Sequence, residues 1–550
     1  MSAIKYDYRN NERGVVLIVC LILLLMLSLI AIASITSSNS DMQVAGNEMN
    51  QTGAFYAAES GIERSAASIA TSYETTGQPP NPLPSGTLTQ GSFRYAYSTT
   101  DNGAAVQTNL TDGAYKNLYG LVKTFNLTSN GIDYLKREAG TTVNMQMRDA
   151  LIPLFQFAVY YEDDLEIAPG PNMTLGGRVH SNHDIYIQSD NNINIDSYLT
   201  SAGDILHGRK PGSGQGLGTG DVFIKDNSGN YQNMKDGDGT WLDSNDPNWV
   251  NNSISRWGGL VEDRNLGITQ LTMPIVRNGA TTNLIDRTGT NNNDSFQNKA
   301  SLTIIDGVVM YKNSSGTWAN VTSTFTSQGI MTATTFHDGR ENKDVNSVDI
   351  NIGLLASKGY YPINGIIYCS QAAGASTINA YRLKNAASLQ AALTVATNNP
   401  LYTVGNFNTT NKKPACLMAD AITVLSGNWN DANSRLDLSH RTATATQVNA
   451  CYIAGNYETG ANGQGYNGGF ENLVRFQENW DGISFTWRGS AANLWYSRQT
   501  AGAWGGSYYS PPNRDWAFDT DLLNIANLPP GTPSVNIVQR SNWSQTVYDP

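Results

Sequence analysis

An uncharged, apolar stretch close to the N-terminus limits what this chain can fold into. No charged residue occurs from Gly14 to Ser40, and the almost wholly apolar segment 15–35 reads VVLIVCLILLLMLSLIAIASI. A helix rises about 1.5 Å per residue, so a run of this length can span a hydrocarbon core about 30 Å thick. The apolar core of a cleaved secretory signal is shorter, about 7–15 residues. The sequence therefore predicts one transmembrane helix.

The residues that follow the apolar run keep a helical spacing. Large apolar side chains recur there at intervals near multiples of 3.6 residues: Val44, Met49, Phe55, Ile62 and Ile69. Gly46 and Gly53 weaken the helix locally and can melt it. We expect one long helix over 15–75 that is apolar in its first half and amphipathic in its second half.

A short polar leader, MSAIKYDYRNNERG, precedes the apolar run and occupies residues 1–14. Its basic side chains slightly outnumber its acidic ones. A positive flank keeps the leader in the cytoplasm and sends the chain after the helix outward.

These features together resemble the N-terminal region of type IV prepilins, and more narrowly that of PilX-like minor pilins. A leader ending in Gly14, an apolar helix directly after it and the block FYAAESGIE at 55–63 carry the resemblance, which covers about the first 75 residues. It implies that prepilin peptidase cuts between Gly14 and Val15 and methylates Val15. It also implies an assembly helix, which we assign to five residues: Val19, Glu48, Phe55, Glu59 and Glu63.

One position departs from the family pattern. Most pilins place a glutamate at the fifth position after the cut, where this chain has Val19. In the family that carboxylate is thought to pair with the terminal amine of a neighbouring subunit. A carboxylate in lipid costs several kcal/mol unless it is paired, so it is kept only where a partner exists. We interpret Val19 as typical of a subunit that initiates or caps a filament.

The rest of the chain predicts an α+β fold in which β structure dominates. Prolines between Pro79 and Pro84 end the helix, and short β-like runs then indicate a pilin headpiece at 76–150. From 151 to 465, apolar triplets such as LEI, IYI and INI alternate with Gly, Asn, Asp and Pro. Each rung of a β-solenoid offers only a short inward strand before a corner, so this rhythm predicts a large, mostly-β, solenoid-like domain.

The C-terminal segment 466–550 is rich in aromatic residues. We expect a helix over 470–479, with Leu473, Phe476 and Trp480 on one face. Two interpretations stay open for the segment: a platform that binds sugars or surfaces, and a cap that covers the end of a solenoid, where aromatic side chains bury large areas. The cap is favoured.

Catalysis and nucleic-acid binding find little support in the residues. The net charge of −11 argues against the basic footprint that nucleic acids require. Acidic residues at 162–166, with His180 and His183 shortly after, are candidates for glycoside chemistry. The two histidines point to opposite faces of a strand, however, and the chain contains no GxSxG, HExxH or Walker-type motif. We therefore expect no enzyme.

Metal and disulfide sites are weakly indicated. Asp236, Asp238 and Asp243 are hard oxygen donors that suit calcium, but they lack EF-hand spacing, and no other cofactor is expected. Three cysteines, Cys369, Cys416 and Cys451, would lie outside the cytoplasm, where oxidation can occur. They can form at most one disulfide among themselves, and buried free thiols are an equal alternative.

The resemblance implies a structural protein that initiates or caps a type IV pilus. Its expected partners are major and minor pilins, the inner-membrane assembly machinery and prepilin peptidase, with a surface or carbohydrate ligand considered for the large domain. We expect a single span in the inner membrane and, after assembly, a location on the pilus. The alternatives are a type II secretion pseudopilin, a membrane-anchored carbohydrate-active β-helix enzyme and an anchored binding protein.

Overall fold

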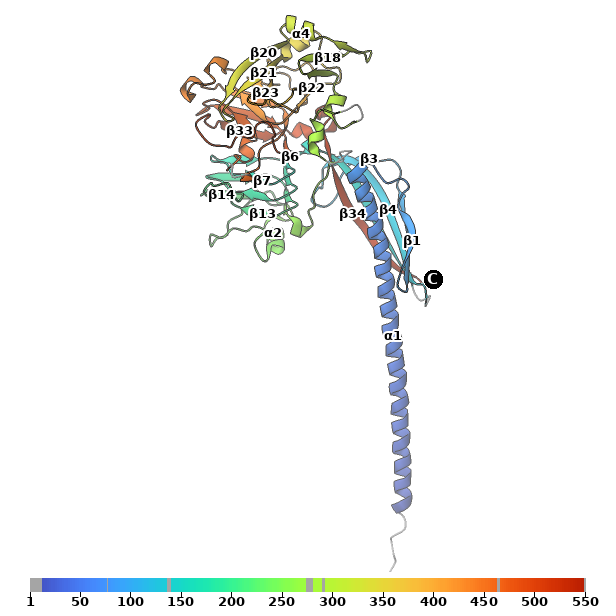
Figure 1. The fold of residues 1–550 in the computed structure, drawn as a ribbon. Helices are drawn as coiled ribbons and strands as arrows, with labels where there is room; N and C mark the ends of the chain where they lie inside the picture. The colour runs from blue at the N-terminus through green and yellow to red at the C-terminus, as the bar shows by residue number, and fades with distance from the viewer. Residues whose placement is uncertain are drawn as a thin grey trace, which may run out of the picture.

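The protein consists of a long helical stalk that carries a β-rich head at one end (Figure 1). The computed structural model describes residues 12–76, 78–135, 140–273, 280–288, 292–461 and 465–548. The stalk is helix α1 (Glu12–Thr76), and it runs through Gly46 and Gly53 without a break, so the predicted local melting does not occur. The predicted class, a long N-terminal helix followed by a large β-rich region, is confirmed.

A six-stranded antiparallel sheet forms the headpiece against which the helix packs. Its strand order is β1-β2-β4-β5-β34, with β3 added beside β4. The strands span Ser85–Gln90 (β1), Phe93–Asp101 (β2), Val106–Asn109 (β3), Tyr119–Asp133 (β4), Gly140–Pro153 (β5) and Ser534–Tyr548 (β34). Burial alternates along β4 and β5, which places one face of this sheet against α1.

Small residues let the second half of α1 lie close to the sheet. A core of Ala58, Ile62 and Ile69 from the helix meets Phe125 of β4 and Val143 of β5. At Gly131 of β4, an added Cβ would stand 2.0 Å from the carbonyl oxygen of Ala54, so only glycine fits there. The helix and the sheet therefore touch backbone to backbone.

The large β domain is an insertion in the headpiece sheet. Strand β5 ends at Pro153, which is the register partner of Ser534 at the start of β34. The chain leaves the sheet and returns to it at neighbouring points, because the backbone amide of Leu154 donates a hydrogen bond to the carbonyl of Pro533 at 2.8 Å. Residues 154–533 thus leave and re-enter between two neighbouring strands. The predicted cap 466–550 is wrong at its end, since its last strand belongs to the headpiece.

The first part of the insertion stacks short strands, many of them about 20 residues apart, and all pair in parallel except Tyr231–Asn233, which pairs antiparallel with its neighbour. Leu165, Ile185 and Ile205 lie directly above one another and are fully buried. The strands are β6 (Phe157–Tyr161), β7 (Leu165–Ile167), β8 (Met173–Leu175), β9 (Arg178–Ser181), β10 (Ile185–Ile187), β11 (Asn192–Ile195), β12 (Leu199–Ser201), β13 (Ile205–His207), β14 (Asp221–Lys225), β15 (Tyr231–Asn233) and β16 (Val261–Glu262). The apolar triplets seen in the sequence are these stacked strands.

A strand near the end of the second part of the insertion pairs with the first strand of the first part. It contains β17 (Leu302–Ile305), β18 (Val308–Lys312), β19 (Trp318–Asn320), β20 (Met331–Asp338), β21 (Lys343–Asn351), β22 (Ile366–Ser370), β23 (Ile378–Lys384), β24 (Leu393–Thr397), β25 (Leu401–Val404), β26 (Ala415–Ala419), β27 (Ile422–Leu425), β28 (Thr446–Asn449), β29 (Cys451–Ala454), β30 (Val474–Phe476), β31 (Ser484–Gly489), β32 (Ala491–Asn493) and β33 (Asn513–Phe518). Strand β32 pairs in parallel with β6, where the domain began. One sheet therefore contains β16-β12-β9-β6 followed by β32-β29-β26-β24-β22-β17. Each of these two runs follows the chain in reverse order, and they are joined where β6 pairs with β32.

Helices in the insertion are short: α2 (Trp249–Trp257), α3 (Phe296–Lys299), α4 (Thr322–Ser327) and α5 (Ile352–Ser357). The helix predicted over 470–479 is wrong. A single 3-10 turn at Phe470–Asn472 leads into strand β30, and Phe476 and Trp480 are both buried in the stacked core. Tertiary stacking outweighs the local pattern there. Stacked parallel strands are observed, whereas the closed coil of a solenoid stays a prediction.

Candidate functional site

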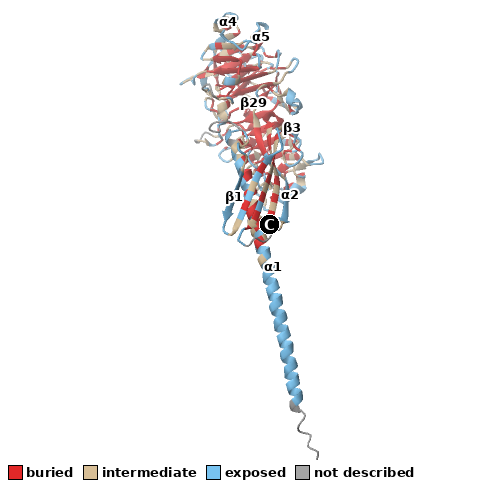
Figure 2. Ribbon diagram, turned by 90° about the vertical axis from the view of Figure 1, so that its right-hand side faces the viewer, coloured by how far each residue is buried: buried red, intermediate tan, exposed pale blue. Residues whose placement is uncertain are grey.

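The first half of α1 has no partner within the described residues. Residues 14–49, which we call the bare segment, are exposed apart from the half-buried Gly46 (Figure 2). Every large apolar side chain from Val15 to Ile35 is exposed, at 48–64% of its area. The packed segment, 50–76, instead places one face of each turn against the headpiece sheet.

The bare segment is costly in water. Covering one valine, leucine, isoleucine or methionine side chain stabilises by about 1.5–3 kcal/mol, so the whole run represents tens of kcal/mol. A domain is typically stable by only about 5–15 kcal/mol. Of the described helices, α1 alone is long and apolar enough to cross a membrane, with a mean hydropathy of 3.5 in its most apolar window. Lipid or other helices must cover this segment.

The predicted processing residues lie at the very start of the bare segment. An added Cβ at Gly14 would meet nothing within 4 Å, and Val15 is 60% exposed. The backbone at this junction is therefore accessible to another protein. The leader before residue 12 lies outside the described residues. Val19 is 48% exposed on the same segment.

The other residues assigned to the assembly helix divide between its two segments. Glu48 is exposed on the bare segment, whereas Phe55 and Glu59 are half-buried on the packed one. The ring of Phe55 meets the edge of Trp543 with centroids 6.2 Å apart. Glu63 pairs with Arg540, with Nη2 and Oε2 3.0 Å apart.

Sequence reasoning missed these two partners from β34. Their separation of more than 470 residues from the helix gives no local signal.

The three cysteines of the β domain are buried free thiols in one sheet. Cys416 of β26 and Cys451 of β29 are register partners on adjacent strands and belong to the same core cluster. Cys369 of β22 belongs to a different cluster of buried residues, which lies on the opposite face of the same sheet. Burial raises the pKa of all three thiols. Of the pairings considered from sequence, the structure places only Cys416 beside Cys451, and a bridge between them stays a prediction.

The aspartates considered for calcium do not converge. Asp236 pairs with Arg256, and Asp238 accepts a hydrogen bond from the amide of Thr240 at 2.9 Å. Asp243 accepts one from the amide of His207 at 3.0 Å. Among the residues that the structure describes, no group of three or more His, Cys, Asp or Glu side chains could hold a metal ion. These residues do not fit the predicted site.

The histidine and acidic cluster near residue 180 forms a structural network. His180 is fully buried between Thr200 at 2.9 Å and Asn182 at 3.1 Å, and burial lowers its pKa to about 4, so its ring is neutral. Glu162 accepts hydrogen bonds from Tyr160 at 3.2 Å and from the amide of Asn182 at 3.1 Å. Burial raises the pKa of Glu162. These contacts hold the first strands of the stack together.

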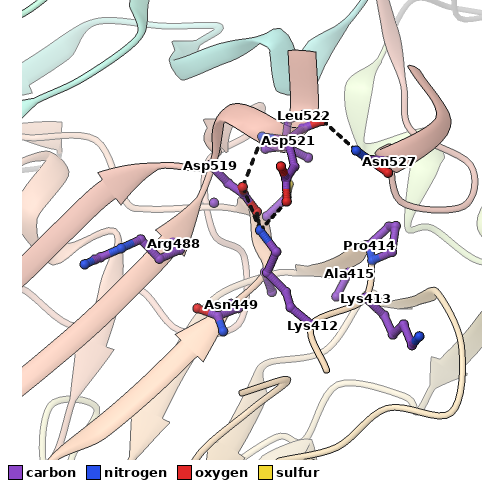
Figure 3. Close-up of a pocket in the computed structure, with 13 residues that line it drawn as sticks. Lys412, Lys413, Pro414, Ala415, Asn449, Arg488, Asp519, Asp521, Leu522 and Asn527 are labelled. Carbon is purple, nitrogen blue, oxygen red and sulfur yellow. Dashed lines mark hydrogen bonds and ion pairs between the residues drawn. The ribbon is translucent and has the colours of Figure 1, made fainter. Parts of the chain in front are cut away.

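A small pocket near β26 is filled by its own charges. The amine of Lys412 lies between Asp519 at 2.7 Å and Asp521 at 2.8 Å, and Arg488 and Asn449 line the opposite side (Figure 3). The cavity measures about 70 Å³. It offers room for a few water molecules, and the charge of Lys412 is already paired.

Comparison with known proteins identifies the N-terminal segment. Residues 13–63 match the family described as PilX N-terminal, which confirms the resemblance found in the sequence for that segment. No curated protein matches the chain. The solved structure of the competence-associated pilin ComZ from Thermus thermophilus aligns with 11% identity over 91% of this chain and 98% of that one. Its TM-score is 0.27, so this likeness carries no argument.

Proposed function

We propose that this chain is a minor pilin that initiates or caps a type IV pilus. The bare segment, which begins directly after Gly14 and has no partner within the described residues, is the observation that carries the proposal. An apolar helix can pass from lipid to a bundle of sister helices at little cost, because both environments are apolar. The match of 13–63 to the PilX N-terminal family supports the same role.

A position at the filament tip follows from two features. Val19 supplies no carboxylate to pair with the amine of a subunit ahead, and a tip subunit has no such neighbour. The insertion 154–533 is much larger than the headpiece that carries it, so it would crowd every turn of a thin shaft. At the tip it projects freely and can present an adhesive surface.

Processing and location follow from the same role. Before assembly the chain spans the inner membrane once, with its head outside the cytoplasm. Prepilin peptidase cuts after Gly14 and methylates Val15, and the pilus assembly machinery then moves the helix into the filament beside other pilins. The role is structural and not catalytic. A pseudopilin in a type II secretion system would use the same helix, and the neighbouring subunits recovered with the chain distinguish the two.

The proposal is tested by the mature N-terminus and the location of the chain. We expect mass spectrometry to find a methylated Val15 as the first residue, and immunogold labelling to mark the ends of sheared pili. A chain that keeps residues 1–14 and stays in the membrane would contradict the proposal. Labels spaced evenly along the shaft would contradict the tip position alone.

Substitution of Val19 tests the missing carboxylate. In Val19→Glu, a tip subunit would place an unpaired carboxylate in an apolar environment, at a cost of about 2.5–3.5 kcal/mol. We expect at least tenfold less of the variant in sheared filaments, measured by immunoblotting. Val19→Leu is the matched control and should incorporate normally. Equal incorporation of the glutamate variant would show that the missing carboxylate at this position does not indicate a tip subunit.

A further inference from the structure

A cavity of about 360 Å³ opens where the two stacks of the β domain meet. Its walls come from the turn 168–171 and Asp190 in the first stack, and from 466–472 and 504–514 near the end of the second. Contacts between β8 and β33 hold the two sides together. The volume lies in the range of ligand pockets, which is about 300–1,000 Å³.

Aromatic rings form one wall of the cavity, and hydrogen bonds hold them in place. The rings of Tyr466 and Trp504 meet nearly at right angles, with centroids 5.4 Å apart. The indole of Trp504 donates to the hydroxyl of Tyr509 at 2.7 Å, and that hydroxyl donates to Asn472 at 2.7 Å. Tyr466 accepts from Arg209 at 3.0 Å. Such preorganised rings lose little entropy when a ligand packs on them.

A glycine is required for this wall. Gly468 has φ +99°, and an added Cβ would stand 2.8 Å from Cδ1 of Trp504. The close approach leaves the indole half-buried, with one side available to the cavity.

Hydrogen bonds to the backbone fix two charged side chains of the lining, Glu471 and Arg514. Oε1 of Glu471 accepts from the amide of Ala168 at 2.7 Å, and Arg514 donates from Nη2 to the carbonyl of Glu471 at 3.1 Å. Among the described residues, Oε2 of Glu471 and Nε of Arg514 are buried without a hydrogen-bond partner. A buried polar group left unpaired costs about 1–3 kcal/mol, and the protein itself covers these two atoms.

The lining carries charges of both signs. Asp190 and Glu471 face Arg209 and Arg514 around the cavity. Burial raises the pKa of Glu471 to about 7, so near neutral pH the lining carries an unbalanced positive charge in part of the molecules and balanced charges of both signs in the rest. A strongly anionic or cationic ligand would meet a like charge in this cavity.

The geometry points to a binding site for a neutral saccharide, one sugar ring stacking on Trp504 and its hydroxyls bonding to Arg514 and Asp190. Ring faces of sugars are apolar and their edges carry hydroxyls, which matches an aromatic wall beside charged donors and acceptors. The inference deepens the proposed function, since it names what a tip-located domain would bind, and rests on it only for that biological setting.

The test uses the full chain in detergent micelles and needs no filament, so its failure is separate from failure of the pilus proposal. The probes are the neutral trisaccharides maltotriose, cellotriose and chitotriose, with trigalacturonate as anion, a chitosan trimer as cation and the peptide Gly-Trp-Gly. Binding is followed by tryptophan fluorescence and calorimetry. We expect at least one neutral trisaccharide to bind more tightly than all three comparison probes.

Variants then locate the site. Trp504→Ala should weaken binding about tenfold or more, as expected for a central aromatic contact. Asp190→Ala, at an exposed position, should weaken saccharide binding about threefold. This second variant keeps the test valid if Trp504→Ala misfolds, and the unfolding midpoint of Trp504→Ala shows whether it does. Trp318→Ala, an exposed indole on β19 at the far end of the twelve-stranded sheet, is the matched control and should bind normally. Absence of neutral saccharide binding, tighter binding of a charged probe or the peptide, or full affinity in a folded Trp504→Ala would overturn the inference.

Discussion

The two segments of α1 differ in a way that hydrophobicity alone does not explain. Among the described residues, the bare segment contains the most apolar helical stretch and is almost wholly exposed, whereas the packed segment is far less apolar and is buried against β2, β4 and β5. In an isolated folded chain the order would normally be reversed. The bare segment therefore suits contacts with lipid or with helices of other chains, and the packed segment suits contacts within this chain.

Residue size separates the two segments as clearly as apolarity does. The packed segment uses Ala54, Ala57, Ala58 and Gly61, which bring the helix backbone close to the sheet. The bare segment carries long side chains that project in all directions. Small residues suit one fixed contact, and long apolar residues suit lipid chains as well as neighbouring helices.

The largest test of the contrast removes β34, an edge strand of the sheet against which the packed segment lies. Deletion of 155–550 takes away β34, which pairs with β5 along its whole length, and should abolish cooperative unfolding of the headpiece. Deletion of 155–532 with a short turn joining Pro153 to Ser534 keeps that pairing and should leave the headpiece folded. Circular dichroism melting and amide exchange over 50–76 measure the difference. Identical melting of the two deletions would show that β34 is dispensable.

Two glycines give a smaller, matched test. In Gly131→Ala the new Cβ would stand 2.0 Å from the carbonyl oxygen of Ala54, and backbone cannot move aside as a side chain can. We expect the free energy of unfolding of the headpiece to fall by about 1–3 kcal/mol. In Gly46→Ala the new Cβ meets nothing within 4 Å on the bare segment, so the free energy of unfolding should stay unchanged or rise by up to about 1 kcal/mol. Urea unfolding measures both, and equal effects would contradict the division of the helix.

The last test is a pH dependence at the contact between the sheet and the packed segment, where Asp149 of β5 meets Tyr73. Burial raises the pKa of Asp149 to about 7 from its ordinary value of 3.8, although Tyr73 and Asn536 oppose the shift. The folded state therefore binds the proton more tightly than the unfolded chain does. Its stabilising contribution is complete below about pH 4 and is lost as the pH rises through about 7.

Asp149→Asn should remove this loss, which for a shift of this size is at most about 4 kcal/mol, and flatten the stability of the headpiece between pH 4 and pH 7. Urea unfolding at several pH values measures the slope. Asp112→Asn, an exposed carboxylate with 56% of its side-chain area accessible, is the control and should keep the wild-type slope. A slope unchanged by Asp149→Asn would assign the pH dependence to other groups.

The elements that the sequence predicts correctly are those with a local period. The apolar run from Val15, the helical spacing up to Ile69 and the short strands at 165–167, 185–187 and 205–207 are all present. The PilX-like segment was likewise readable, because its residues are contiguous. The helix predicted at 470–479 failed because a three-residue strand inside a stacked core has too few residues to show a period of its own.

Other features depend on which distant segments meet. Neither the return of β34 to the headpiece, nor the pairing of β32 with β6, nor the cavity between 168–171 and 504–514 has a signature in any short stretch of residues. Local sequence sets the backbone period and the burial of one face, which is enough to identify helices and strands. Pairing is chosen among many similar apolar strands by the packing of the whole domain, and that choice becomes visible in the folded chain alone.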